Sequence, residues 1–172
     1  MTIHDFKESL ARSHSYENAT WWIDVYRQAF PNLEAAVSVR NDGWAQRAGI
    51  DRVLTLRSGK TQTVDEKVRE KDWPDVLLER WSNKDKRTPG WIQQELACDF
   101  IAYAYVPSRT CLLFPFPTLR RAWLKHGRAW VETHQIVHAQ NNGYVTESVA
   151  VPRAELFDAL RDAMEIKWDE AA

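Results

Sequence analysis

The stretch GIDRVLTLRSGKTQTVDEKVR, residues 49–69, decides how the fold of this chain is interpreted. Apolar residues alternate with polar ones on both sides of Ser58-Gly59, which predicts two short strands joined by a turn. Each strand carries charge where a half-buried strand normally carries none. The charged residues are Asp51 in the first strand and the run Asp65, Glu66 and Lys67 in the second.

Strand geometry divides these charges between the two faces of the hairpin. Alternate residues share a face, so Asp65 and Lys67 point the same way and Glu66 points to the other side. Pairing across the turn brings Asp51 to the same end of the sheet. Two converging carboxylates bind a hard divalent cation, and a lysine beside them can hold a water or help to deprotonate it. This grouping suits phosphodiester hydrolysis; the alternative is a solvated hairpin in which Asp65 and Lys67 only form an ion pair.

The composition is that of an ordinary globular chain. Its 172 residues are 44% hydrophobic and 27% charged, with a net charge of −1. This length suits one domain, and the near-neutral charge argues against a generally basic nucleic-acid coat protein. No apolar run approaches the ~18 residues of a membrane span, and the polar N-terminus does not resemble a signal or transit peptide. We expect Cys98 and Cys111 to be free thiols in a reducing cytoplasm.

Hydrophobic periodicity and turn residues predict alternating helices and strands. We expect helices over residues 16–30, 91–97 and 117–126 and from Pro152 onward, and strands over residues 35–39, 50–56, 61–69, 75–81, 100–106, 111–116, 131–139 and 144–151. Ser15 is the expected cap of the first helix. The buried stripe of the last helix is expected to be Leu156, Phe157, Leu160 and Met164. The strands at 50–56, 61–69 and 76–81 should be neighbours in one mixed sheet.

Two other motifs do not withstand inspection. Ser58-Gly59-Lys60-Thr61 resembles the end of a phosphate-binding loop, but the first glycine of that motif is replaced by Leu54. His134 and His138 have the spacing of helical zinc ligands, yet their segment is predicted to be a strand. A four-residue offset along a strand spans roughly 13 Å, which is too far for one metal ion.

The pattern over roughly residues 16–97 resembles the PD-(D/E)XK nuclease superfamily, which includes restriction enzymes, resolvases and phage recombination exonucleases. A helix precedes the hairpin, the first aspartate lies in the preceding strand, and a strand and then a helix follow. The resemblance implies a restriction-endonuclease-like α/β (α+β) fold. Its mixed sheet would be flanked by helices in a single nuclease-like domain, residues 1–172.

The resemblance also implies roles for individual residues. Asp51 corresponds to the first metal-binding aspartate, Asp65 to the (D/E) position and Lys67 to the lysine. Glu17 corresponds to an extra acidic residue that some members carry in the preceding helix. Gln93 or Gln94 corresponds to a polar residue that some members place near the site.

The sequence departs from the family pattern at two positions of the hairpin. Ile50, rather than proline, precedes Asp51. The position between Asp65 and Lys67 is usually apolar, and here it is Glu66. Because Val64 and Val68 share its face of the strand, Glu66 is expected either to reach the rim of the sheet or to pair with an arginine.

A segment with basic but no acidic residues is a candidate nucleic-acid-binding surface. No acidic residue occurs between Asp99 and Glu132, while the segment contains Arg109, Arg120, Arg121, Lys125 and Arg128. Such a segment predicts a phosphate-contacting face, on which Trp123 and Trp130 could stack on unpaired bases. The alternative is that Leu119, Trp123 and the neighbouring apolar residues form core while the basic side chains are simply solvated.

The sequence therefore predicts a nuclease that requires Mg²⁺ or Mn²⁺ and acts on DNA rather than RNA. Asp51 and Asp65 are the expected metal ligands, and Lys67 handles the water. We expect a cytoplasmic protein that does not associate with membranes. As for its oligomeric state, the sequence is compatible with a homodimer. The alternative is a catalytically inactive module that keeps the nuclease fold and binds nucleic acid or a protein partner. An unrelated structural or interaction protein, whose hairpin is only a solvated edge, is a third hypothesis.

Overall fold

The computed structural model of the chain describes Tyr16 and residues 19–164. The protein is mixed α/β and contains two sheets. Its contacts define two compact units. The first comprises residues up to Asp72, Glu95–Phe116 and Ala139–Gly143, and the second comprises Trp73–Gln94, Pro117–His138 and residues from Tyr144 onward. Ser15 and Glu17 lie outside the described residues.

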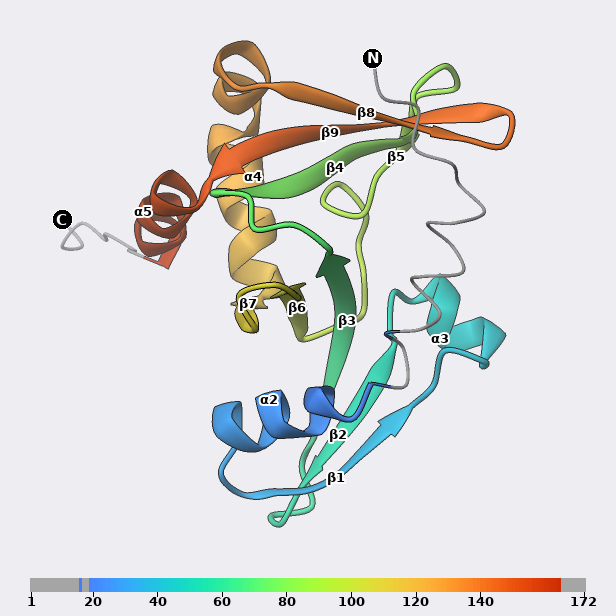
Figure 1. The fold of residues 1–172 in the computed structure, drawn as a ribbon, viewed down its shortest axis with the longest axis vertical. Coiled ribbons are helices and arrows are strands. Elements are labelled where there is room, and N and C mark those ends of the chain that lie inside the picture. Colours follow the sequence, from blue (N-terminus) through green and yellow to red (C-terminus); the bar gives the residue numbers. More distant parts are fainter. Residues whose placement is uncertain (1–15, 17–18, 165–172) are drawn as a thin grey trace, which may run out of the picture. The chain divides into compact units, whose positions relative to one another are not determined.

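The first unit is built on a five-stranded sheet with the order β1-β2-β3-β6-β7 (Figure 1). Its strands are β1 (Leu33–Ser38), β2 (Arg52–Leu56), β3 (Thr61–Arg69), β6 (Phe100–Tyr105) and β7 (Thr110–Pro115). The β1–β2, β2–β3 and β6–β7 pairs are antiparallel, whereas β3 and β6 run parallel. The predicted hairpins at 50–69 and 100–116 are therefore confirmed.

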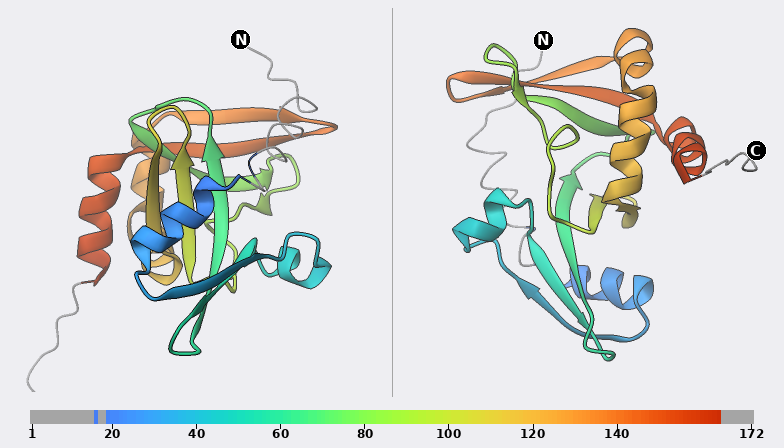
Figure 2. Two further views of the ribbon diagram at one scale, coloured as in Figure 1. Left: turned by 60° about the horizontal axis from the view of Figure 1, so that its bottom comes forward. Right: turned by 180° about the vertical axis from the view of Figure 1, so that it is seen from behind.

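Helix α2 (Trp21–Ala29) crosses one face of this sheet (Figure 2). Trp22 and Tyr26 lie one helical turn apart and are completely buried. They pack with Leu54 and Val64 of the hairpin. The helix ends before Pro31, which cannot continue it. The prediction of a helix over residues 16–30 is confirmed for Trp21–Ala29, whereas Ala19 and Thr20 are not helical.

The residues between β1 and β2 form a short helix, α3 (Gly43–Arg47). Asp42 caps it, because its side chain accepts hydrogen bonds from the N–H groups of Trp44 and Ala45, at 2.8 and 2.9 Å. The sequence Asn41-Asp42-Gly43 thus starts a helical turn at the end of β1.

The second unit contains a four-stranded sheet with the order β5-β4-β9-β8, except for the end of β8 from Ala139 onward, which is assigned to the first unit. Its strands are β4 (Asp75–Asn83), β5 (Thr88–Pro89), β8 (Ile136–Asn141) and β9 (Tyr144–Pro152), and its helices are α4 (Phe116–Thr133) and α5 (Arg153–Met164). Helix α4 lies over one face of this sheet (Figure 2). Buried valines and leucines of β4 and β9 form the core together with Leu156 and Leu160 of α5.

Three secondary-structure predictions are wrong. Strand β4 is not a neighbour of the hairpin, because β6 occupies that edge of β3 and β4 pairs with β9. Residues 91–94 form a turn and residues 95–97 have no regular structure, so the helix predicted over 91–97 is absent. Residues 131–133 belong to α4, so the strand predicted from Val131 begins only at Ile136.

The buried stripe of α5 also differs from the prediction. Leu156 and Leu160 are buried as expected, but Phe157 and Met164 are exposed. Two alanines, Ala159 and Ala163, take the remaining buried positions. None of the helices in the described part of the chain is both long and apolar enough to cross a membrane.

Candidate functional site

The hairpin places Asp51 and Asp65 next to each other. Asp51 stands directly before β2, and its N–H donates to the carbonyl of Val64 at 2.9 Å. Its Oδ2 accepts a hydrogen bond of 2.8 Å from the N–H of Glu66. This register brings the Asp51 carboxylate against the middle of β3, where the side chains of Asp51 and Asp65 interact directly.

Lys67 completes this group from the same strand. Its Nζ lies 2.8 Å from Oδ1 of Asp65, as expected for residues that share a face of β3. Asp65 is buried and the Lys67 side chain is about one third exposed. The structure thus brings together the three residues that the sequence selected, Asp51, Asp65 and Lys67.

The pairing of the two carboxylates makes ionisation of Asp51 costly. Burial raises the pKa of Asp51 to about 6, and the negative charge of Asp65 contributes to this rise, while the guanidinium of Arg40 and the N–H of Glu66 act in the opposite direction. Ionisation of Asp51 beside the Asp65 side chain therefore has a cost in free energy. A cation that both carboxylates bind would remove this repulsion.

Asp51 and Asp65 are the residues that could hold a metal ion. Mg²⁺ is commonly bound by one or two carboxylates, with waters and substrate phosphates as its other ligands, so this oxygen donor set fits it. Within the described ranges, Tyr16 and 19–164, no group of three or more histidine, cysteine or acidic residues could enclose a metal. Glu17, the additional acidic residue predicted for the catalytic site, lies outside these ranges.

Glu66 is buried on the opposite face of β3, under α2. Its Oε1 accepts hydrogen bonds of 2.6 Å from both the hydroxyl of Tyr26 and Nε of Arg52, and its Oε2 accepts one of 3.0 Å from Nη2 of Arg40. Of the two expectations for Glu66, pairing with an arginine is confirmed. Burial and the charge of Glu66 both raise the pKa of Tyr26, so its hydroxyl stays a donor.

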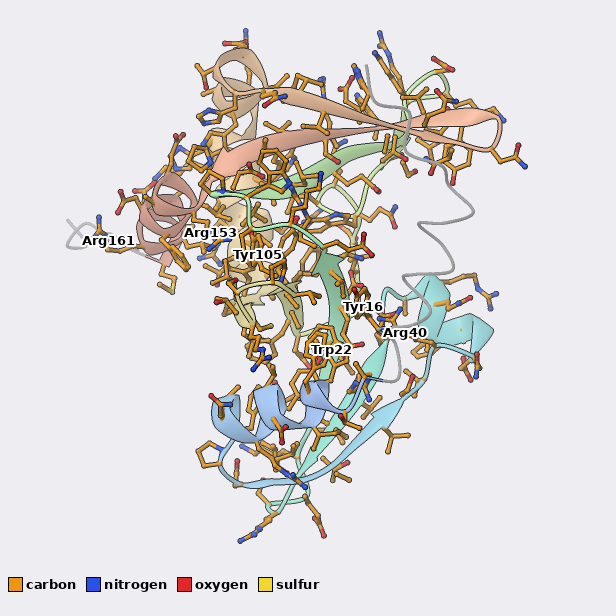
Figure 3. All side chains as sticks on the ribbon, viewed as in Figure 1. Tyr16, Trp22, Arg40, Tyr105, Arg153 and Arg161 are labelled. Carbon is orange, nitrogen blue, oxygen red and sulfur yellow. The ribbon has the colours of Figure 1, made fainter. Side chains whose placement is uncertain are left out.

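Sequence reasoning missed Arg40, Arg52 and Tyr26. Arg52 pairs with Val64 across the hairpin, so the period of two already placed it on the Glu66 face. Arg40 follows β1, and its side chain lies beside β2, while Trp22 lies between α2 and the sheet (Figure 3). The usable signal was an arginine directly after Asp51, Arg52, and another shortly after the preceding strand, Arg40.

The side chains of Gln93 and Gln94 form hydrogen bonds within the second unit. The amide of Gln93 donates to the carbonyl of Arg80, and the amide of Gln94 donates to the carbonyl of Pro89 at 2.8 Å. Both side chains therefore hold the turn after β5 against β4 and β5.

The five predicted nucleic-acid-binding residues do not lie on one element. Arg109 lies in the turn before β7 in the first unit, and Arg120, Arg121, Lys125 and Arg128 lie on α4 in the second. On α4, Arg121 donates to the carbonyl of Ala163 at 3.0 Å, Lys125 contacts Asp162 at 2.5 Å and Arg128 contacts Glu132 at 3.1 Å.

Trp123 and Trp130 cannot serve as base-stacking platforms in this arrangement. Both side chains are buried, at 8% and 2% relative exposure. Their rings contact each other, with centroids 6.3 Å apart. The alternative that the tryptophans of α4 belong to the core is therefore confirmed.

The histidines and cysteines show no sign of a metal or nucleophile site in the described part of the chain. His134 contacts Glu155 at 3.0 Å and His138 contacts Glu147 at 3.1 Å, so each has its own carboxylate partner. Cys98 and Cys111 are free thiols, and burial raises the pKa of each to about 12. Such thiols are poor nucleophiles at neutral pH.

Comparisons with protein-family models, curated proteins and solved structures find no match to this chain. The interpretation of the site therefore depends on its own geometry.

Proposed function

We propose that this protein is a metal-dependent nuclease that hydrolyses phosphodiester bonds in DNA and has a restriction-endonuclease-like fold. The observation that supports the proposal most strongly is the convergence of Asp51, Asp65 and Lys67 on one side of β3. Asp51 lies directly before β2, and Asp65 lies in the adjacent strand β3. A fixed pair of this kind is suited to holding a cation in a defined position.

The residues divide the chemistry between them. Asp51 and Asp65 would bind Mg²⁺ or Mn²⁺ through their carboxylate oxygens. A divalent cation bound there supplies a Lewis acid for the phosphoryl oxygen and lowers the pKa of a bound water. Lys67 is held by Asp65 and is partly exposed, so its ammonium can hold a water or a phosphate oxygen beside the carboxylates.

A second candidate function is favoured by the position of Arg40. Its Nη2 lies 3.1 Å from Oδ2 of Asp51, so the site carries a positive charge of its own. A carboxylate that is already paired has less need of a metal ion. This observation supports a catalytically inactive module that keeps the fold and binds nucleic acid or a protein partner.

A cleavage assay separates the two candidates. Linear, nicked, branched and single-stranded DNA would be incubated with the protein and Mg²⁺ or Mn²⁺, with RNA of the same sequence alongside. The nuclease proposal expects metal-dependent cleavage of at least one DNA substrate that stops when the metal is chelated. Binding of DNA without cleavage of any substrate would favour the inactive module. Neither binding nor cleavage would reject the nuclease and leave only a module that binds a protein partner.

A further inference from the structure

Arg40 joins carboxylates on the two faces of β3. Its Nη2 lies 3.1 Å from Oδ2 of Asp51 and 3.0 Å from Oε2 of Glu66. Asp51 belongs to the candidate metal site, and Glu66 belongs to the buried network under α2. The Arg40 side chain is 19% exposed, so it is accessible to solvent at the edge of this network.

Among the described residues, the ion pairs at the hairpin join equal numbers of carboxylates and cations, so this group has no net charge. The hairpin charge cluster contains three carboxylates and three cations, namely Asp51, Asp65, Glu66, Arg40, Arg52 and Lys67. Each carboxylate has at least one of the three cations within hydrogen-bonding distance. A divalent cation that enters this cluster brings an excess of two positive charges and meets the guanidinium of Arg40 at Asp51. Coulomb repulsion at such short range opposes binding of the cation alone.

We propose that Arg40 is the resident counter-ion of this site, that it competes with the divalent cation for Asp51, and that the cation consequently binds together with a phosphodiester. The inference rests on the proposed function and adds an order of assembly to it. A phosphodiester brings one negative charge, and its oxygens offer the guanidinium a replacement for the Asp51 carboxylate. Arginine suits this role because its planar donors match phosphate oxygens. Glu66 would keep Arg40 in place throughout.

The first test uses the unmodified protein. The affinity for Mn²⁺ would be measured by calorimetry with and without a duplex whose phosphorothioate linkages resist cleavage. We expect Mn²⁺ to bind about tenfold more tightly, or better, when the duplex is present, because its charge offsets that of Arg40. The duplex would in turn bind more tightly with Mn²⁺, by the same factor. Equal Mn²⁺ affinity with and without the duplex would overturn the proposal.

The second test removes the counter-ion. Arg40→Gln should bind Mn²⁺ about tenfold more tightly than the parent in the absence of DNA, because the cluster then has a net negative charge. The gain from adding the duplex should shrink in the same variant. Arg40→Lys keeps the charge and should stay close to the parent. Arg47→Gln, which removes an exposed arginine from α3, is the matched control and should change neither affinity.

The outcomes separate this inference from the proposed function. If the parent binds no Mn²⁺ with or without DNA, both are rejected. If the parent binds Mn²⁺ and cleaves DNA but folded Arg40→Gln binds Mn²⁺ like the parent, only the role of Arg40 is rejected. Should Arg40→Gln fail to fold, the measurement on the unmodified protein decides alone.

Discussion

At the scale of single residues, Glu66 is a buried charge whose stability depends on its hydrogen-bond partners. Its side chain is completely buried and accepts hydrogen bonds from Tyr26, Arg52 and Arg40. We expect Glu66→Ala to lower the free energy of unfolding by about 3–5 kcal/mol, because it leaves Arg52 buried without its carboxylate. Tyr26→Phe removes a single hydrogen bond and should cost about 1–3 kcal/mol. Urea denaturation measures both, and the exposed Glu34→Ala serves as the control, with a change within about 0.5 kcal/mol.

Asp51 gives the site a characteristic pH dependence. Its pKa is about 6 in the folded chain against an ordinary 3.8, so the folded state binds the proton more tightly than the unfolded state. The contribution of Asp51 therefore lowers the free energy of unfolding as the pH rises from about 4 to about 6. In chelator, Asp51→Asn should be more stable than the parent at pH 7, by up to about 3 kcal/mol, and this gain should vanish below pH 4. A difference that is the same at pH 4 and pH 7 would contradict the assignment, and Asp72→Asn is the exposed control.

Substitutions of the carboxylates and of the lysine should have different effects on Mn²⁺ binding, although each should abolish cleavage. Asp65→Asn and Asp51→Asn should each abolish cleavage and weaken Mn²⁺ binding, because each removes a ligand. DNA binding without metal should survive or strengthen, since each substitution also removes a charge that repels phosphate. Lys67→Ala should abolish cleavage with little loss of Mn²⁺ affinity, because an ammonium is not a ligand. If all three variants cleave DNA like the parent, the hairpin is not a catalytic site.

The sequence predicted the carboxylates and the lysine but not the arginine that contacts them. Asp65, Lys67 and Asp51 belong to one hairpin, where a period of two and a short turn determine which side chains meet. Arg40 follows a third strand and reaches Asp51 only because β1 pairs with β2. Long-range pairing of this kind has no local signature in a single sequence.

At the scale of elements, α4 shows how a glycine inside a helix can be mistaken for its end. A glycine at position 127 favours a helix that stops there, yet the helix continues to Thr133. A Cβ at position 127 would come within 2.8 Å of the Trp123 indole. The glycine therefore makes room for a buried tryptophan one turn earlier, and the β-branched Val131 and Thr133 beyond it belong to a helix despite their strand propensity.

The sheet to which β4 belongs could not be predicted from the sequence either. The apolar alternation of residues 76–81 and the short turn at Ser58-Gly59 predicted this strand beside the hairpin, and successive strands are usually neighbours. The parallel strand β6 takes that position instead. Five of its six residues are buried, which is typical of a parallel strand covered on both faces. The choice between β4 and β6 depends on these long-range contacts.

The basic residues of α4 remain a testable DNA-contacting element. Replacing both Arg120 and Arg121 with alanine should weaken DNA binding and reduce its salt dependence by roughly one unit of log-log slope for each phosphate that the variant no longer neutralises. Because Arg121 also binds the carbonyl of Ala163 near the end of α5, thermal unfolding must be measured alongside. Arg161→Ala, on α5, is the exposed control. An unchanged slope in a folded double variant would remove α4 from the DNA-binding surface.

At the scale of the whole molecule, the chain alternates between the two compact units. Each unit is assembled from three separate segments, so neither is a continuous stretch of sequence. The sheet of the first unit needs β6 and β7, which follow the β4–β5 segment of the second. Because each unit includes residues from both halves of the sequence, neither unit is complete until most of the chain is present. The prediction of a single domain over residues 1–172 is thus compatible with two compact units.

Cooperative unfolding tests this prediction directly. We expect one thermal transition, with equal calorimetric and van't Hoff enthalpies, because loss of either unit releases segments that anchor the other along the chain. Amide hydrogen exchange supplies the local measurement. The N–H of Val64 in β3 and that of Val149 in β9 report on the two sheets, and both should exchange with the same free energy of opening. Two transitions, or protection that disappears in one sheet well before the other, would show that the units unfold as separate domains.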